Sequence, residues 1–87
     1  MEIEKLKAFA AVAETGSFTR AAEKLYTSHS SISRAVSALE RELCVKLIER
    51  DNRVGGLTRA GEILLKGAED ILGREEAVKK EISELSE

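Results

Sequence analysis

Ten consecutive residues near the middle of the chain, 28–37, combine many hydroxyl groups with one guanidinium group. Five of the ten are serines, and His29 and Arg34 stand among them. Such side chains donate hydrogen bonds to phosphate oxygens and to base edges without filling a groove. Serine is only a middling helix former, so this composition would be unusual on a helix face that meets water alone. The stretch therefore predicts a surface that binds a polyanion such as duplex DNA.

A helix over residues 29–43 would separate this polar surface from an apolar stripe. Ile32, Val36, Leu39 and Leu43 recur at spacings of four, three and four, which is the period of one helix face. Ser28 is the predicted N-cap, so the free N–H groups and the positive dipole end would point at an anion. The alternative is a solvated serine-rich face in a small bundle. The predicted polar face holds Ser30, Arg34, Ser37 and Arg41, with His29 and Ser33 on its flank.

The charges are distributed unevenly along the chain. The whole chain has a net charge of −2, yet no acid occurs between Glu23 and Glu40. Residues 19–59 hold eight Lys and Arg against five acids, and residues 60–87 hold four against eight. The local balances of +3 and −4 indicate a basic unit that approaches a polyanion and an acidic segment that stays away from it.

Composition excludes several classes of function. Eighty-seven residues, 43% of them hydrophobic, suit one small domain near the size at which a single core is marginal. One cysteine and one histidine provide neither a disulfide framework nor a four-ligand zinc site, and no Gly-rich phosphate loop or nucleophile–base set is present. We therefore expect no enzyme and no cofactor. No secretory segment or apolar run of ~20 residues occurs, so we expect a cytoplasmic protein without membrane contact.

Two shorter helices are expected before the serine-rich one. Apolar positions from Leu6 to Ala13 predict a helix over about 2–14, which Thr15 and Gly16 would end. Ser17 would then cap a helix over 18–25. The second and third helices together form a predicted helix-turn-helix.

A short hairpin is expected after residue 43. Residues 45–48 have a strand-like pattern, residues 51–56 suit a turn, and Leu57 begins the return. This hairpin is a predicted wing, from which Arg50 and Arg53 reach a phosphate or the minor groove. The alternative is a plain hairpin in which Arg50 pairs with Glu49 or Asp51.

Thr58 is the predicted cap of a long helix that continues to the chain end. Its apolar residues follow a heptad spacing, and only Glu75 interrupts them. The helix is longer than the rest of the domain can cover. We therefore expect a homodimer through this helix, with residues 1–57 as the DNA-binding domain and 58–87 as a dimerisation helix. The predicted interface residues are Leu64, Ala68, Ile71, Val78, Ile82 and Leu85.

With these residues in place, the chain resembles the N-terminal winged helix-turn-helix domain and linker helix of LysR-type transcriptional regulators. The resemblance implies sequence-specific promoter binding, a dimer that reads an inverted repeat, and a small-molecule-sensing C-terminal domain in full-length relatives. It also implies base contacts by His29, Ser30, Ser31 and Arg34, a phosphate contact by Ser33 and a wing contact by Arg53. The residues that carry it are Leu6, Phe9, Gly16 to Thr19, Ala21, Ala22, Leu25, Ser28, Ser33, Arg34, Leu39, Glu40, Leu47, Arg50, Leu57, Thr58, Ala60 and Gly61.

The chain departs from the family pattern at several positions. The family usually has Gln and often Pro where this chain has His29 and Ser30, so the target sequence is not transferable. It usually has Gly where Cys44 stands and Phe where Ile48 stands. Two other functions fit the residue pattern: a coiled-coil dimer whose winged helix binds a protein, and a DNA binder without sequence preference.

Overall fold

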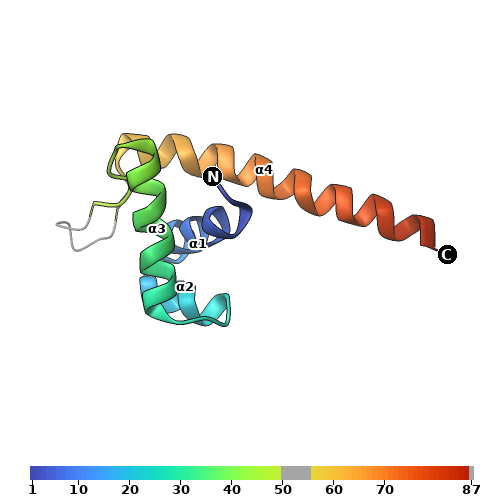
Figure 1. Cartoon of the computed structure of the whole chain (residues 1–87), viewed down its shortest axis with the longest axis horizontal. Coiled ribbons are helices and arrows are strands. Elements are labelled where there is room, and N and C mark those ends of the chain that lie inside the picture. Colours follow the sequence, from blue (N-terminus) through green and yellow to red (C-terminus); the bar gives the residue numbers. More distant parts are fainter. Residues whose placement is uncertain (50–55, 87) are drawn as a thin grey trace.

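The structure is a computed structural model that describes residues 1–49 and 56–86. Within these ranges the chain forms four α-helices and a final 3-10 turn. α1 lies between the other three helices and contacts each of them. Figure 1 shows α3 at one end of the molecule and α4 extending away from it. The elements are α1 (Ile3–Thr15), α2 (Phe18–Lys24), α3 (His29–Leu43), α4 (Arg59–Ser83) and η1 (Glu84–Ser86).

Local signals set the ends of α1 and α2 within one residue of the expected positions. α1 continues to Thr15, whose Oγ1 donates to the Ala11 carbonyl at 2.7 Å, and Gly16 ends it with φ +72°. Ser17 then caps α2, its Oγ accepting from the Arg20 N–H at 3.0 Å. α2 ends at Lys24 rather than Leu25, and Tyr26 reverses the chain with φ +56°.

The base of the predicted wing is present as one antiparallel bridge, between Ile48 and Leu57. The Glu49 N–H donates to the Gly56 carbonyl at 2.8 Å, and the Thr58 N–H donates to the Leu47 carbonyl at 3.1 Å. The described residues on either side of the turn form this bridge without a longer strand. The predicted turn, with Arg50 and Arg53, lies outside the described residues.

The core forms where α1 packs against α2, α3 and the first half of α4. Its largest fully buried side chains come from α1, α3 and the residue before the bridge. Ala21 of α2 is also fully buried, which lets the neighbouring helices approach closely. The six largest are Phe9, Leu6, Ile32, Leu39, Leu47 and Val36.

α4 begins in the core and leaves it. Thr58 caps it, its Oγ1 accepting from the Gly61 N–H at 3.0 Å, and Ala68 is fully buried. Further along, Val78 and Ile82 are exposed, and the molecule measures 51 × 24 × 20 Å because this part of the helix projects as an arm (Figure 1). α4 ends at Ser83 and the 3-10 turn follows, so the α-helix stops short of the expected end. No described helix combines the length and apolarity needed to cross a bilayer.

Candidate nucleic-acid interface

The candidate interface is built on α3, whose first turn is organised by the predicted cap. The Ser28 Oγ accepts from the Ser31 N–H at 3.1 Å and donates to the Ser31 Oγ at 2.9 Å. It also lies 3.2 Å from the Ser30 Oγ. The N–H groups of His29 and Ser30 belong to the first turn, where helix geometry supplies no acceptor. This end of α3 therefore presents backbone donors and hydroxyl groups together, next to the positive end of the helix dipole.

The two faces of α3 divide as the periodicity predicts. Ile32, Val36 and Leu39 face the core with at most 2% of their surface exposed, whereas Leu43 departs from the stripe and is 38% exposed. Among the predicted contact residues, Ser28, His29, Ser30 and Arg34 are exposed, and Ser31, Ser33 and Ser37 are half-buried. The geometry thus brings seven of the nine predicted DNA-binding residues onto one helix and its cap, and the other two, Arg50 and Arg53, lie outside the described residues.

Cations on this face are not neutralised by neighbouring acids in the described part of the chain. Neither Arg34 nor Arg41 forms an ion pair with a described residue. An unpaired surface guanidinium can bind a phosphate or a base edge bidentately without first breaking an internal pair. The local positive balance predicted from the sequence is therefore available at the surface of α3.

Phe18 contributes to this interface in a way that sequence analysis missed. Its ring lies 5.7 Å from the His29 ring, centroid to centroid, at an interplanar angle of 40°. Tilted aromatic pairs at this separation attract each other, so Phe18 restricts the orientation of the first side chain of α3. The sequence signal that places Phe18 near the turn is its position directly after the Ser17 cap.

Glu40 is a second residue whose role was missed. Its side chain is buried, and one carboxylate oxygen accepts from the Leu47 N–H at 2.8 Å and from the Ile48 N–H at 3.4 Å. Hydrogen bonds to a carboxylate are stronger than those between neutral groups, and a buried backbone N–H needs such a partner. Glu40 therefore joins the end of α3 to the first residues of the wing.

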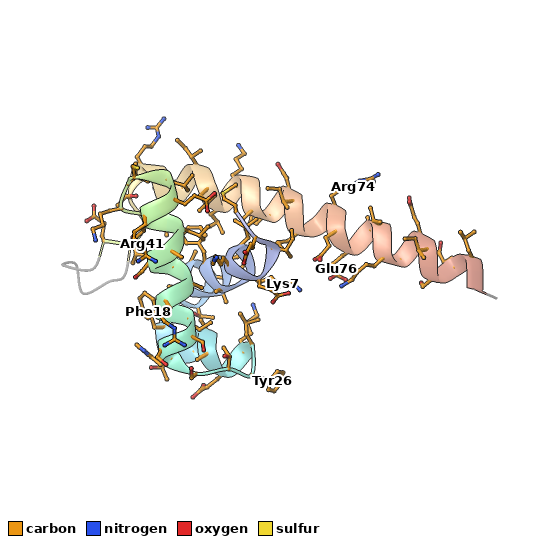
Figure 2. The ribbon with its side chains drawn as sticks, viewed as in Figure 1. Lys7, Phe18, Tyr26, Arg41, Arg74 and Glu76 are labelled. Carbon is orange, nitrogen blue, oxygen red and sulfur yellow. The ribbon has the colours of Figure 1, made fainter. Side chains whose placement is uncertain are left out.

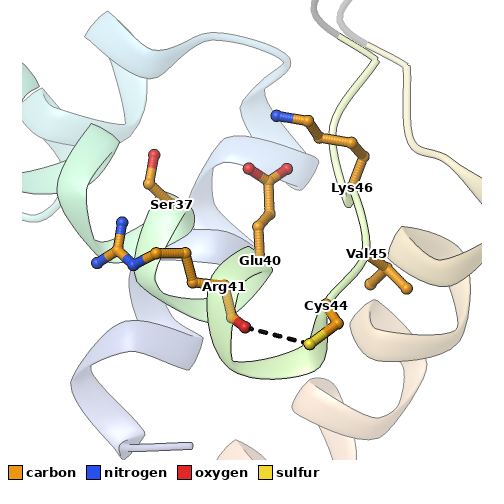
Figure 3. A pocket seen from close by; sticks show the side chains of 6 residues that line it. All are labelled: Ser37, Glu40, Arg41, Cys44, Val45 and Lys46. Atoms are coloured by element: carbon orange, nitrogen blue, oxygen red, sulfur yellow. Dashed lines mark hydrogen bonds between the residues drawn. The ribbon is translucent and has the colours of Figure 1, made fainter.

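A depression lies beside the second half of α3. Its volume is about 510 Å³, and Figure 3 shows the six side chains that line it. Two of them, Arg41 and Lys46, are exposed cations, and the Cys44 Sγ donates to the Arg41 carbonyl at 3.6 Å. The depression joins α3 to the wing base, so both cations lie at the border between these two elements. The lining residues are Ser37, Glu40, Arg41, Cys44, Val45 and Lys46.

The acidic arm lies away from this surface. In Figure 2, Arg41 on α3 and Phe18 at the start of α2 lie remote from the free end of α4, whereas Arg74 and Glu76 lie on the projecting arm. Separation of the negative segment from α3 follows from the direction in which α4 leaves the core. The charge division seen along the sequence is therefore also a division in space.

The predicted dimer residues divide into two groups. Ala68 is fully buried in the core of its own chain and Leu64 packs partly against that core, so Ala68 is not available to a partner. This corrects the expectation for Ala68: α1 crosses α4 at this level and covers it. The remaining four are exposed, Ile71 by 39%, Val78 by 37%, Ile82 by 61% and Leu85 by 83%.

These elements, with α3 presented at the surface beside a bridged wing base, define a winged helix-turn-helix protein. Residues 3–62 match the family described as "Bacterial regulatory helix-turn-helix protein, lysR family". The match covers more than half of the chain, and the chain therefore belongs to the LysR family.

Curated relatives support this assignment. The chain is 41% identical over 86 residues to an uncharacterized HTH-type transcriptional regulator of Azotobacter vinelandii, covering 99% of this chain and 60% of that protein. It is 50% identical over 70 residues to the HTH-type transcriptional activator AaeR of Escherichia coli K12, covering 80% of this chain and 23% of that protein. The chain thus spans less than two thirds of the length of these relatives.

Solved structures of similar fold include DNA complexes. The DNA-binding domain of BenM in complex with benA site 1 DNA matches with a TM-score of 0.92 and 32% identity, over 99% of this chain and 97% of that one. The CbnR DNA-binding domain in its DNA complex matches with a TM-score of 0.87 and 38% identity, over the full length of both chains.

Proposed function

We propose that this chain is the DNA-binding part of a cytoplasmic transcriptional regulator and binds duplex DNA sequence-specifically, with α3 in the major groove. The observation that carries the proposal is the exposed face of α3, where a capped first turn, several hydroxyl groups and an unpaired Arg34 lie together. An α-helix with short polar side chains fits the major groove, where each base pair has a distinct pattern of donors and acceptors. The similarity to domains solved with DNA supports the same assignment.

Roles on this face follow from position and chemistry. Arg34, His29 and Ser30 are exposed at the start of α3 and read base edges, and Ser31 lies with them. Ser33 and Ser37 donate to phosphates, as do Arg41 and Lys46 at the depression. Ser28 acts as the cap that holds the first turn of α3, whose free N–H groups face the phosphates. Arg50 and Arg53 act from the wing on the backbone or the minor groove. A small-molecule inducer would act through a further domain of a longer protein, of the kind that the family resemblance implies.

We also propose that the chain acts as a homodimer through the exposed stripe of α4. Four large apolar side chains follow one another along the arm at heptad spacing, and between 37% and 83% of the surface of each is exposed. A two-fold dimer presents two copies of α3, so the target is an inverted repeat whose half-sites are about one helical turn (~34 Å) or a multiple of it apart. Residues 1–57 are then the reading unit and 58–87 the dimerisation helix.

A binding titration tests the proposal. A preferred duplex is selected from a random pool, and affinity for it and for an unselected duplex is measured at two salt concentrations. We expect preference for the selected duplex and a steep loss of affinity with salt, because bound cations displace counterions. Arg34→Ala should reduce the preference by ~1–3 kcal/mol, which is about 5- to 150-fold.

Arg74→Ala is the matched control. It removes the same charge from an exposed position on the arm, remote from α3 (Figure 2). It should leave the preference unchanged. Equal binding of all duplexes by the wild type would indicate a non-specific binder, and the absence of any salt-dependent binding would indicate a protein-interaction module; either result contradicts the proposal.

A further inference from the structure

Glu75 stands on the apolar stripe of α4, and a contact within the same chain accounts for it. Its Oε1 lies 4.0 Å from the Nζ of Lys7 on α1. That oxygen is buried and accepts no hydrogen bond from the described residues, although the side chain as a whole is 30% exposed. Lys7 also lies 3.8 Å from Glu4 Oε2, one turn earlier on α1. Glu75 therefore belongs to the junction between α1 and α4.

The position of this pair matters because it lies where α4 leaves the rest of the chain. Ala68 is fully buried, Leu72 is partly buried against the core, and Val78 is 37% exposed. Ala68 and Glu75 are seven residues apart, which is ~10 Å along a helix axis. The core contact at Ala68 and the Lys7–Glu75 pair are therefore two points, about two helical turns apart, at which α4 meets the rest of the chain.

Small changes in that direction have large effects at the DNA. The rest of the molecule is 24 and 20 Å across. A tilt of ~10° at the junction moves a point ~20 Å away by ~3.5 Å, close to the rise of one base pair (~3.4 Å). In a dimer built through the arms, the tilt applies to both subunits. The distance between the two copies of α3 therefore depends on the angle between the arm and the rest of the chain.

We propose that Lys7 and Glu75 are positioning residues that set this angle and thereby the half-site spacing that the dimer accepts. The proposal rests on the dimeric DNA binding proposed above. An ion pair suits this task because its energy depends on where the partner charge lies, whereas an apolar contact tolerates sliding along the helix. Neither side chain touches the DNA in this mechanism; both act through the placement of α3.

The test measures spacing preference and half-site affinity separately. Inverted repeats of the selected half-site are prepared with spacers that differ in steps of one base pair, together with a single half-site duplex. The wild type should prefer one spacing over its neighbours by about fivefold or more. Glu75→Gln and Lys7→Gln should each flatten that preference, while affinity for the single half-site stays within about twofold. The double variant Lys7→Glu with Glu75→Lys should restore it.

A second ion pair provides the matched control. Lys79 and Glu76 lie 3.5 Å apart on the exposed part of the arm, and Glu76→Gln removes that pair without affecting the junction. Glu76→Gln should keep the wild-type spacing preference, and melting temperatures show that all variants are folded. If Glu75→Gln keeps the wild-type preference while the wild type binds as a dimer, the positioning role is overturned and the DNA-binding function stands. A wild type without DNA binding or without dimers overturns both.

Discussion

At the scale of single residues, the Cβ of Cys44 at the end of α3 affects the stability of the fold. Cys44 has φ +59° and ψ +37°, and its N–H donates to the Glu40 carbonyl as the helix closes. This is the left-handed region that favours glycine, and the family usually has glycine at this position. In this region a Cβ lies too close to the following carbonyl oxygen, and glycine, which has no Cβ, avoids that clash. Cys44 therefore carries a conformational cost at the point where α3 meets the wing.

Cys44→Gly should raise the free energy of unfolding by up to ~1 kcal/mol, or about 4–8 °C in melting temperature for a domain of this size. The thiol is exposed, so little packing is lost. Gly16→Ala is the mirror control: Gly16 has φ +72° and open space around a Cβ, so it should lower the melting temperature through backbone strain alone. Calorimetry shows whether the melting temperature rises for Cys44→Gly and falls for Gly16→Ala. A lower melting temperature for Cys44→Gly would mean that the thiol contributes more than its Cβ costs.

At the scale of elements, the fold depends on how closely α4 approaches the wing base. A Cβ at Gly61 would overlap the Leu47 carbonyl oxygen. That oxygen accepts a hydrogen bond from the Thr58 N–H. Leu47 is also held by Glu40 of α3. Three elements thus meet around one backbone segment, and the spacing between α4 and that segment leaves room only for glycine.

Gly61→Ala should destabilise the chain by ~1–3 kcal/mol, because backbone on both sides must move to admit the methyl group. Gly73→Ala is the matched control on the same helix. Apart from the adjacent residues and the backbone of the helix itself, no described atom lies within 4 Å of a Cβ there, so the substitution should instead stabilise by up to ~1 kcal/mol through helix propensity. Urea denaturation measures both. Equal effects of the two substitutions would contradict the close approach at Gly61.

At the scale of the whole molecule, the arm is too long for its own chain to cover. The exposed apolar residues beyond the junction have no described neighbour that removes them from water, and a small core gains stability from a partner. Their heptad spacing suits a second helix, which makes a second copy of the chain the natural occupant.

Val78→Asp should dissociate the dimer, because the partner helix would bury an unpaired carboxylate at a cost of ~3–5 kcal/mol. Ser83→Asp adds the same charge on a different face of α4 and should leave the dimer intact. Sedimentation equilibrium at micromolar concentrations distinguishes the two variants. A monomeric wild type, or a dimeric Val78→Asp variant, would remove the arm from the interface.

Some of this architecture was predictable from the sequence because the relevant forces act over a few residues. The bounds of α3, the caps Ser17, Ser28 and Thr58, and the left-handed residues at 16 and 44 depend on neighbouring groups in the chain. Periodicity likewise predicted which face of α3 is buried. The family pattern, a set of such local signals in a fixed order, was recognisable for the same reason.

The remaining features depend on residues that are far apart in the chain. Periodicity places Ala68 and Ile71 on one stripe of α4, but only the crossing of α1 decides that the first is covered and the second is exposed. From the sequence alone Glu40 is a surface acid. Only the structure shows that its carboxylate accepts a hydrogen bond from the Leu47 N–H. Lys7 and Glu75 are 68 positions apart, and no local rule pairs them. A helical pattern tells which side of a helix is apolar; only tertiary packing decides which neighbour that side meets.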